Sequence, residues 1–227
     1  MLTKFGNWIF HYRNFLFPLF YLTLFIPSPD IFGNVKTALI LGGVIIFLGV
    51  FTRSATIGLV YIVRGGKNRR IHANNLVTEG IYSVCRNPMY LGNILLILGF
   101  AVFSNSLLFL LVMFPFFVFI YVAIIKAEEA FLIGKFGDEY REYKKTTYAI
   151  IPKLMGVGKL FKEYKFNFTR VVIREYNSLF IYFTGILLIL LYKELINLKL
   201  FAIIFAAVLV VYLVIKVLKK KGILVAK

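Results

Sequence analysis

The sequence predicts an all-α membrane protein, a polytopic helical bundle of about six transmembrane helices. Sixty per cent of its 227 residues are hydrophobic, and the mean hydropathy is +0.84, which exceeds the apolar content of a soluble domain. The apolar residues form long continuous blocks, as membrane-spanning helices require. The strands of a membrane β-barrel would instead alternate apolar and polar residues.

Six apolar blocks are the expected spans, and a proline pair or a short polar turn separates several of them. In chain order they are Ile9–Ile26, Val35–Val63, Met89–Phe103, Leu107–Phe136, Leu179–Tyr192 and Leu200–Val217. Pro27 and Pro29 end the first block, because proline lacks the N–H that a continuing helix needs. Ser104–Ser106 is a short turn between the third and fourth blocks, so these two blocks should form a tight hairpin.

Three regions follow from this order. Residues 1–152 are the expected transmembrane core, 153–178 a basic amphipathic interfacial segment, and 179–227 an additional C-terminal hairpin. Glycines at Gly42, Gly43 and Gly49 should permit close packing of the second span against a neighbour.

The charge distribution predicts that both termini are cytoplasmic. The chain has 27 Lys and Arg against 10 Asp and Glu, a net charge of +17. Most of these cations fall on one side of the expected spans, as the positive-inside rule requires, and they would face anionic lipid. No nucleic-acid-binding motif accompanies the charge, so no nucleic-acid partner is expected.

Two single residues have alternative interpretations. Arg53 lies within an apolar block, where it would either extend to the membrane surface or contact an anionic group inside the protein. Cys85, the single cysteine, is either a small buried residue or a nucleophile with a pKa lowered by Arg86.

Two polar clusters, residues 74–92 and 126–143, should meet at the cytosolic face and form one pocket. The first supplies Arg86, three asparagines and two tyrosines, and the second supplies Glu128 and Glu129. These groups suit a zwitterionic ligand with hydroxyls. They contain no nucleophilic triad, metal-ligand set or phosphate-binding glycine loop, so no metal is expected. The alternative for the glutamate pair is a solvated helix end paired with Lys126.

The first cluster resembles a known signature. Its pattern, Leu76-Val77-Thr78-x-Gly80-x-Tyr82-x3-Arg86-Asn87-Pro88-x-Tyr90-x-Gly92, is similar to the RHPxYxG-type motif of isoprenylcysteine carboxyl methyltransferases, which phospholipid methyltransferases share. The second cluster, from Glu128-Glu129 through Phe136-Gly137 to Tyr140 and Tyr143, resembles the second signature of these integral membrane methyltransferases. The similarity covers roughly residues 41–152.

The resemblance implies S-adenosylmethionine-dependent methyl transfer to a lipophilic or small acceptor. It implies catalytic roles for Arg86, Glu128 and Glu129. Its implied cofactor-binding residues are Asn74, Asn75, Leu76, Val77, Tyr82, Asn87, Pro88, Met89, Tyr90 and Glu128. Arg86 would either anchor the cofactor carboxylate or brace the loop.

The chain departs from the family pattern at three positions. Asn74 and Asn87 stand where the family usually has histidine, and asparagine cannot titrate near neutral pH. Ile124 occupies the position of a substrate-binding arginine of the carboxyl methyltransferases.

Two other functions therefore stay open. One is an NADPH-dependent membrane reductase of the sterol reductase type, with Arg64, Arg69 and Arg70 facing the 2′-phosphate. The other is a non-catalytic relative that binds lipid or a partner. The sequence specifies neither the acceptor nor the oligomeric state.

Overall fold

The computed structural model describes residues 1–59, 64–67, 70–153, 158, 160 and 164–225. The chain forms two compact units, Met1–Tyr164 and Lys165–Lys227. Helices dominate both units, and the described strands are one short antiparallel hairpin, so the predicted all-α membrane bundle is confirmed.

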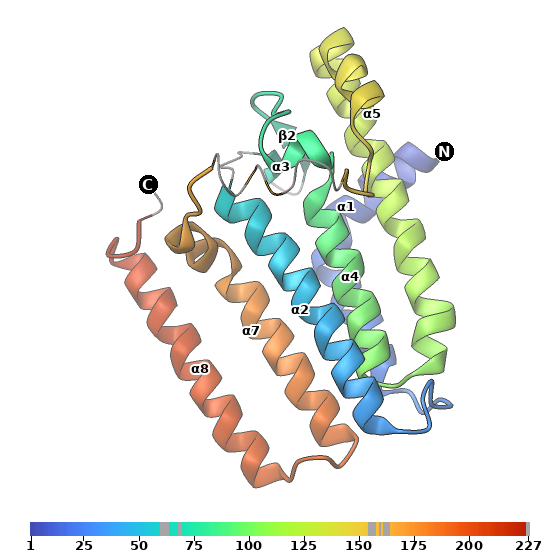
Figure 1. The fold of residues 1–227 in the computed structure, drawn as a ribbon, viewed down its shortest axis with the longest axis vertical. Helices are drawn as coiled ribbons and strands as arrows, with labels where there is room; N and C mark the ends of the chain where they lie inside the picture. Colours follow the sequence, from blue (N-terminus) through green and yellow to red (C-terminus); the bar gives the residue numbers. More distant parts are fainter. Residues whose placement is uncertain (60–63, 68–69, 154–157, 159, 161–163, 226–227) are drawn as a thin grey trace. The chain divides into compact units, whose positions relative to one another are not determined.

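The first unit is built on two helix pairs (Figure 1). Helix α2 packs along α4, and α1 packs along α5. The bounds of the helices are Leu2–Tyr21 for α1, Val35–Leu59 for α2, Ile81–Val84 for α3, Pro88–Phe103 for α4 and Phe114–Thr146 for α5. The hairpin pairs β1 (Arg64–Lys67) with β2 (Arg70–Ala73). A 3₁₀ turn, Leu22–Phe25, follows α1, and a π-helical turn, Phe109–Met113, precedes α5.

Four helical stretches in the described ranges are long and apolar enough to cross a membrane: α2, the stretch Phe109–Thr146 that includes α5, and the helices α7 and α8. Helix α4 is apolar but has only 16 residues. Helix α1 has 20 residues but is not among the four, because Lys4, His11 and Arg13 make it more polar. The expected end of the second span, residues 60–63, lies outside the described residues.

Glycines bring α2 and α4 into close contact. A Cβ atom added at Gly42 would lie 2.5 Å from the Cα of Phe103, and one at Gly49 would lie 2.9 Å from the carbonyl oxygen of Gly92. At Gly43 an added Cβ would meet nothing within 4 Å among the described residues. The packing role predicted for Gly42 and Gly49 is therefore confirmed, whereas the one predicted for Gly43 is wrong because Gly43 points away from α4.

The turn between α4 and α5 is fixed by one side chain. Asn105 has a positive φ of 53°. Its side-chain oxygen accepts hydrogen bonds from the backbone N–H groups of Ile31 (3.0 Å) and Phe32 (2.9 Å), and its amide donates to the Phe32 carbonyl (2.9 Å). The predicted tight hairpin is confirmed, and it returns the far end of α5 to the start of α4.

Helix α5 then folds back on itself. Gly137 interrupts it with φ 55° and ψ −125°, a conformation that favours glycine. Lys144 lies 2.9 Å from Glu129, although fifteen residues of straight helix would separate them by about 22 Å. Leu132, Tyr140 and Tyr143 form a small core with Ala73 of β2, which holds the returning segment in place.

The second unit is a helical hairpin of α7 (Phe168–Tyr192) and α8 (Leu198–Lys220). Asn167 caps α7 by accepting from the backbone N–H of Arg170 at 2.8 Å. This cap starts α7 well before the predicted position 179. Tyr212 of α8 stacks on Tyr176 of α7, with ring centroids 5.5 Å apart. Of the predicted interfacial segment, residues 154–157, 159 and 161–163 lie outside the described residues.

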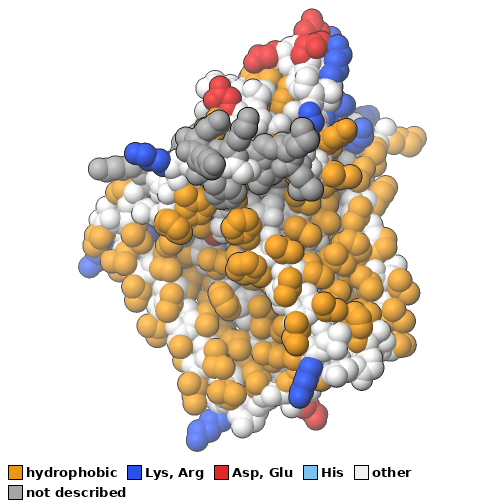
Figure 2. All heavy atoms as spheres, viewed as in Figure 1, with side chains coloured by type: hydrophobic (Ala, Val, Ile, Leu, Met, Phe, Trp, Pro, Cys, Tyr) orange, Lys and Arg blue, Asp and Glu red, His pale blue; other side chains and the backbone are white. Residues whose placement is uncertain are grey.

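Exposed apolar side chains cover the described helices, as a lipid environment requires. Helix α8 has no buried residue. Figure 2 shows hydrophobic side chains over the helices and mixed charges gathered at the end of α5. The exposed acids and bases there include Asp138, Glu139, Arg141 and Glu142.

The contact between α2 and α4 generates a prediction with an adjacent control. Gly42→Val should destabilise the protein by about 1–3 kcal/mol, because the new side chain would clash with the backbone of Phe103. Gly43→Val should change stability far less. Thermal unfolding in detergent, followed by circular dichroism, measures both. Equal losses in the two variants would contradict this packing.

Candidate functional site

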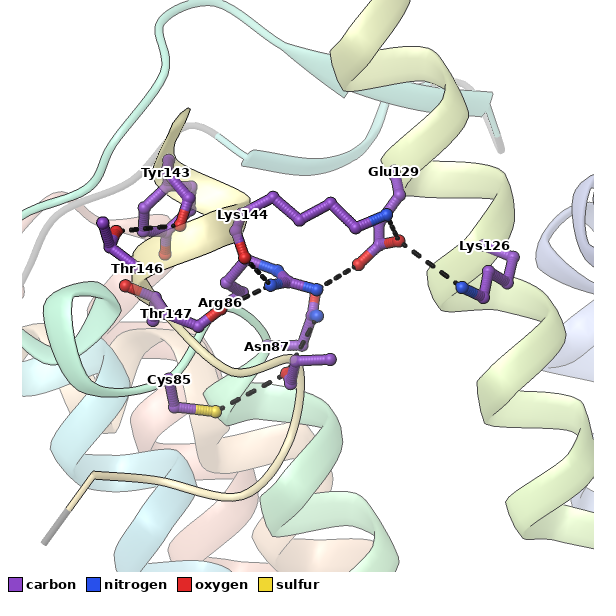
Figure 3. Close-up of polar contacts among 10 residues, drawn as sticks. Cys85, Arg86, Asn87, Lys126, Glu129, Tyr143, Lys144, Thr146 and Thr147 are labelled. Atoms are coloured by element: carbon purple, nitrogen blue, oxygen red, sulfur yellow. Dashed lines mark hydrogen bonds and ion pairs between the residues drawn. The ribbon is translucent and has the colours of Figure 1, made fainter. Parts of the chain in front are cut away.

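Glu129 is the centre of a buried ionic cluster (Figure 3). One carboxylate oxygen lies 2.5 Å from Nη2 of Arg86, and the other lies 2.9 Å from Nζ of Lys144 and 3.9 Å from Nζ of Lys126. Arg86 is 5% exposed and Glu129 4%, so water screens their interaction little. The alternative of a solvated helix end is wrong, although the expected contact with Lys126 is present.

Arg86 connects three parts of the chain. Its Nη1 donates to the backbone carbonyl of Lys144 at 3.0 Å and to that of Thr147, while its Nη2 donates to Glu129. Its backbone N–H donates to the Tyr148 carbonyl at 2.9 Å. The guanidinium therefore joins the segment before α4 to α5 and to the loop that follows α5. These contacts are those of a residue that braces the loop.

Asn87 holds the same loop. Its backbone N–H and its side-chain Nδ2 both donate to the carbonyl of Ala149, each at 3.0 Å. Asn87 also precedes the first residue of α4, Pro88, which is buried and stands where helices tolerate proline. Both residues thus set the start of α4.

Cys85 is buried beside this loop. Its Sγ lies 3.2 Å from the carbonyl oxygen of Ile150. Burial raises the pKa of the Cys85 thiol to about 11, and the opposing effects of the Asn87 backbone and the Arg86 charge are smaller. The thiol is therefore protonated at neutral pH, which favours the interpretation of a buried packing residue over that of a nucleophile.

Glu128 pairs with Tyr90. The Tyr90 hydroxyl donates to Oε1 of Glu128 at 2.5 Å, and both side chains are buried. The Tyr90 ring lies 5.4 Å from that of Tyr121, centroid to centroid. Consecutive glutamates of one helix thus contact different partners, since successive helical residues point about 100° apart.

The segment before α3 is placed by packing. Leu76 packs against the core of Ala73, Leu132, Tyr140 and Tyr143. Tyr143 donates its hydroxyl hydrogen to the carbonyl of buried Tyr82 at 2.6 Å. The structure therefore brings the two predicted polar clusters into contact.

The remaining predicted residues lie nearer the surface. Asn74 and Asn75 are exposed, and Val77 and Met89 are half-buried. The Asn74 side-chain oxygen lies 2.8 Å from Nε2 of His72. The His72 imidazole thus lies beside Asn74, one of the two positions where the family pattern has histidine.

Sequence reasoning missed Lys144. The signal that points to it is Gly137, which lies about midway between Glu129 and Lys144 and marks the reversal of α5. Arg53 also has a definite position: it is 9% exposed, and its Nη1 donates to the Asn93 side chain. Arg53 therefore faces the protein interior rather than extending to the membrane surface.

Apolar helices long enough to cross a membrane, with a buried polar cluster that joins the start of α4 to α5, define an integral membrane helical bundle. Residues 35–139 match the phospholipid methyltransferase family. The resemblance that the sequence predicts is thus confirmed for this region, which contains both Arg86 and the glutamate pair.

Curated relatives include two methyltransferases and a metal-resistance protein. The chain is 35% identical over 114 residues to protein-S-isoprenylcysteine O-methyltransferase of Schizosaccharomyces pombe. The aligned region covers 46% of this chain and 45% of the relative. It is 27% identical over 129 residues to methanethiol S-methyltransferase 1 of Bradyrhizobium diazoefficiens, covering 56% and 44%. It is 39% identical over 103 residues to the cobalt-zinc-cadmium resistance protein CzcN of Cupriavidus metallidurans, covering 44% and 45%.

The chain thus spans a little under half the length of each of these relatives. No solved structure matches it.

Breaking the buried cluster should be costly. Glu129→Gln leaves Arg86 and Lys144 without their shared carboxylate, so we expect a loss of about 3–5 kcal/mol of unfolding free energy. The control is Glu142→Gln, which removes an exposed pair with Lys145 and should change stability by less than about 0.5 kcal/mol. Unfolding by detergent titration measures both. Similar values for the two variants would rule out the buried cluster.

Cys85 allows a test by chemical labelling. Because its pKa is about 11, the folded protein should react with iodoacetamide at pH 8 at least about tenfold more slowly than the unfolded protein. The rate should rise with pH toward 11, as the thiolate forms. Mass spectrometry of the single cysteine measures the rate. Equal rates in the folded and unfolded states would show that the thiol is exposed.

Proposed function

We propose that this protein is an S-adenosylmethionine-dependent methyltransferase, with its cofactor site formed by residues 74–92 and 126–143. The observation that carries the proposal is the buried Tyr90–Glu128 pair at the junction of the two signatures, inside the region that matches the family. The relatives named as methyltransferases support it.

The chemistry of the site fits such a cofactor. The buried Glu128 carboxylate can accept hydrogen bonds from an ammonium group or from ribose hydroxyls. Tyr90 holds this carboxylate in one orientation. Leu76 and Tyr82, from the same segment 74–92 as Tyr90, would supply apolar contacts to the cofactor. When bound, S-adenosylmethionine supplies an activated methyl group. The residues of this chain would orient the two reactants and exclude water.

Arg86 and Glu129 act differently in this proposal. Arg86 donates to two backbone carbonyls and to Glu129, and Glu129 also accepts from Lys144. We therefore assign them to positioning the loop and α4 rather than to contact with the reacting atoms. Asn87 has a similar role, since its amide holds Ala149, and this role needs no titratable group.

The remaining features of the proposal concern location and acceptor. The distribution of Lys and Arg favours a site at the cytosolic face of the membrane. The acceptor is lipophilic or small, by analogy with relatives named for isoprenylcysteine and methanethiol. The reductase alternative requires Arg64, Arg69 and Arg70, of which Arg69 lies outside the described residues, and it has no support among the relatives.

Calorimetric titration of the purified protein tests the proposal. We expect saturable binding of S-adenosylmethionine, weakened about tenfold or more in Tyr90→Phe and Glu128→Gln, because each change removes part of a charge-assisted hydrogen bond. Glu142→Gln is the control and should bind normally. Binding of NADPH in place of S-adenosylmethionine would favour the reductase. Binding of neither by folded protein would favour a non-catalytic relative.

A further inference from the structure

The C-terminal hairpin gathers basic side chains at the end where α7 begins and α8 finishes (Figure 1). The described residues 168–178 and 212–225 at this end contain six Lys and Arg and one acid, the buried Glu175. Helix α7 contributes Arg170 and Arg174, and the end of α8 contributes Lys216, Lys219, Lys220 and Lys221. All four of these lysines are exposed. This end of the hairpin therefore presents a strongly positive surface.

The cations of the two helices lie at the same level along the hairpin. Nζ of Lys219 donates to the backbone carbonyl of Ile173 at 3.0 Å, so the last turns of α8 lie beside the second turn of α7. Arg174 directly follows Ile173 in that turn. Positive charges that share one level repel one another and raise the local concentration of anions.

Two of the lysines are held against a pair of stacked rings. Nζ of Lys219 lies 4.8 Å from the ring centroid of Tyr176, and Nζ of Lys216 lies 5.6 Å from that of Tyr212. These two rings stack on each other. An ammonium group over an aromatic face is attracted by the negative charge of the ring face. Both ammonium groups are thus positioned in advance, which lowers the entropy that binding an anion costs.

The level of these lysines is that of lipid headgroups. Residues 200–215 of α8 include no charged side chain, and they span about 24 Å as a helix, which is most of the hydrocarbon thickness of a bilayer. Within α8, no residue is buried, so its side chains face lipid when the helix crosses a membrane. Lys216 is the first charged residue after this apolar run, and lipid phosphates lie where the hydrocarbon ends.

From these observations we propose that the basic end of the hairpin binds the phosphate of an anionic phospholipid, with Lys216 and Lys219 as its main contacts. Lys220 and Lys221 add attraction, as clusters of Lys and Arg beside a membrane helix do for anionic lipids. A zwitterionic lipid is disfavoured, because its own cationic group would be repelled. The hairpin lies outside residues 35–139, which match the methyltransferase family, so this proposal is independent of the proposed function.

Native mass spectrometry of the detergent-solubilised protein tests the proposal. The protein is titrated with dioleoyl phosphatidylglycerol and, separately, with dioleoyl phosphatidylcholine, which has the same acyl chains but a zwitterionic headgroup. We expect saturable binding of phosphatidylglycerol, about tenfold or more tighter than that of phosphatidylcholine. The double variant Lys216→Gln/Lys219→Gln should weaken phosphatidylglycerol binding about tenfold or more. The double variant Lys216→Arg/Lys219→Arg keeps both charges and should keep the preference.

The matched control is Lys193→Gln/Lys199→Gln, which removes two lysines at the opposite end of the same hairpin and should leave phosphatidylglycerol binding unchanged. Circular dichroism of each variant checks that it is folded. Equal affinity of the wild type for the two lipids overturns the proposal. Equal loss in the control, or loss in the arginine variant, also overturns it, because the site would then not depend on these two charges. Inorganic phosphate is added in a competition experiment, and displacement of phosphatidylglycerol by an equal concentration of phosphate would overturn the assignment to a lipid.

Discussion

The candidate site depends on the ion pairs that the buried carboxylate of Glu129 makes. It binds Arg86 from the segment before α4 and Lys144 from the returning end of α5. A buried ion pair adds little net stability compared with apolar packing, but removing one partner leaves an uncompensated charge. The cluster therefore specifies one arrangement of three segments. That arrangement sets the positions of Tyr90 and Glu128, which the proposed function needs.

Much of the helical arrangement could be predicted from residue patterns. The apolar blocks predicted the long helices, and the Ser104–Ser106 turn predicted the hairpin of α4 and α5. That hairpin brought Arg86 near Glu129, although they are separated by 43 residues in sequence. Glycines indicated the contact between α2 and α4. Sequence did not distinguish Gly42 from its neighbour Gly43, because the choice depends on the rotation of α2 about its axis.

Other features could not be predicted, for physical reasons. The partners of Arg86 and Asn87 include the backbone carbonyls of Lys144, Thr147 and Ala149, and every residue has a carbonyl, so no side-chain pattern marks them. The reversal at Gly137 depends on a positive φ that glycine permits but does not require.

We propose different roles for two adjacent glutamates, ligand binding for Glu128 and a structural role for Glu129. A thermal-shift experiment with and without S-adenosylmethionine tests this assignment most directly in the wild type, Glu128→Gln and Glu129→Gln. We expect the cofactor to raise the unfolding temperature of the wild type. Without the cofactor, Glu129→Gln should lower the unfolding temperature much more than Glu128→Gln does, whereas Glu128→Gln should lose most of the cofactor-dependent rise. A Glu128→Gln variant that retains the full rise, or a Glu129→Gln variant as stable as the wild type, would contradict this assignment.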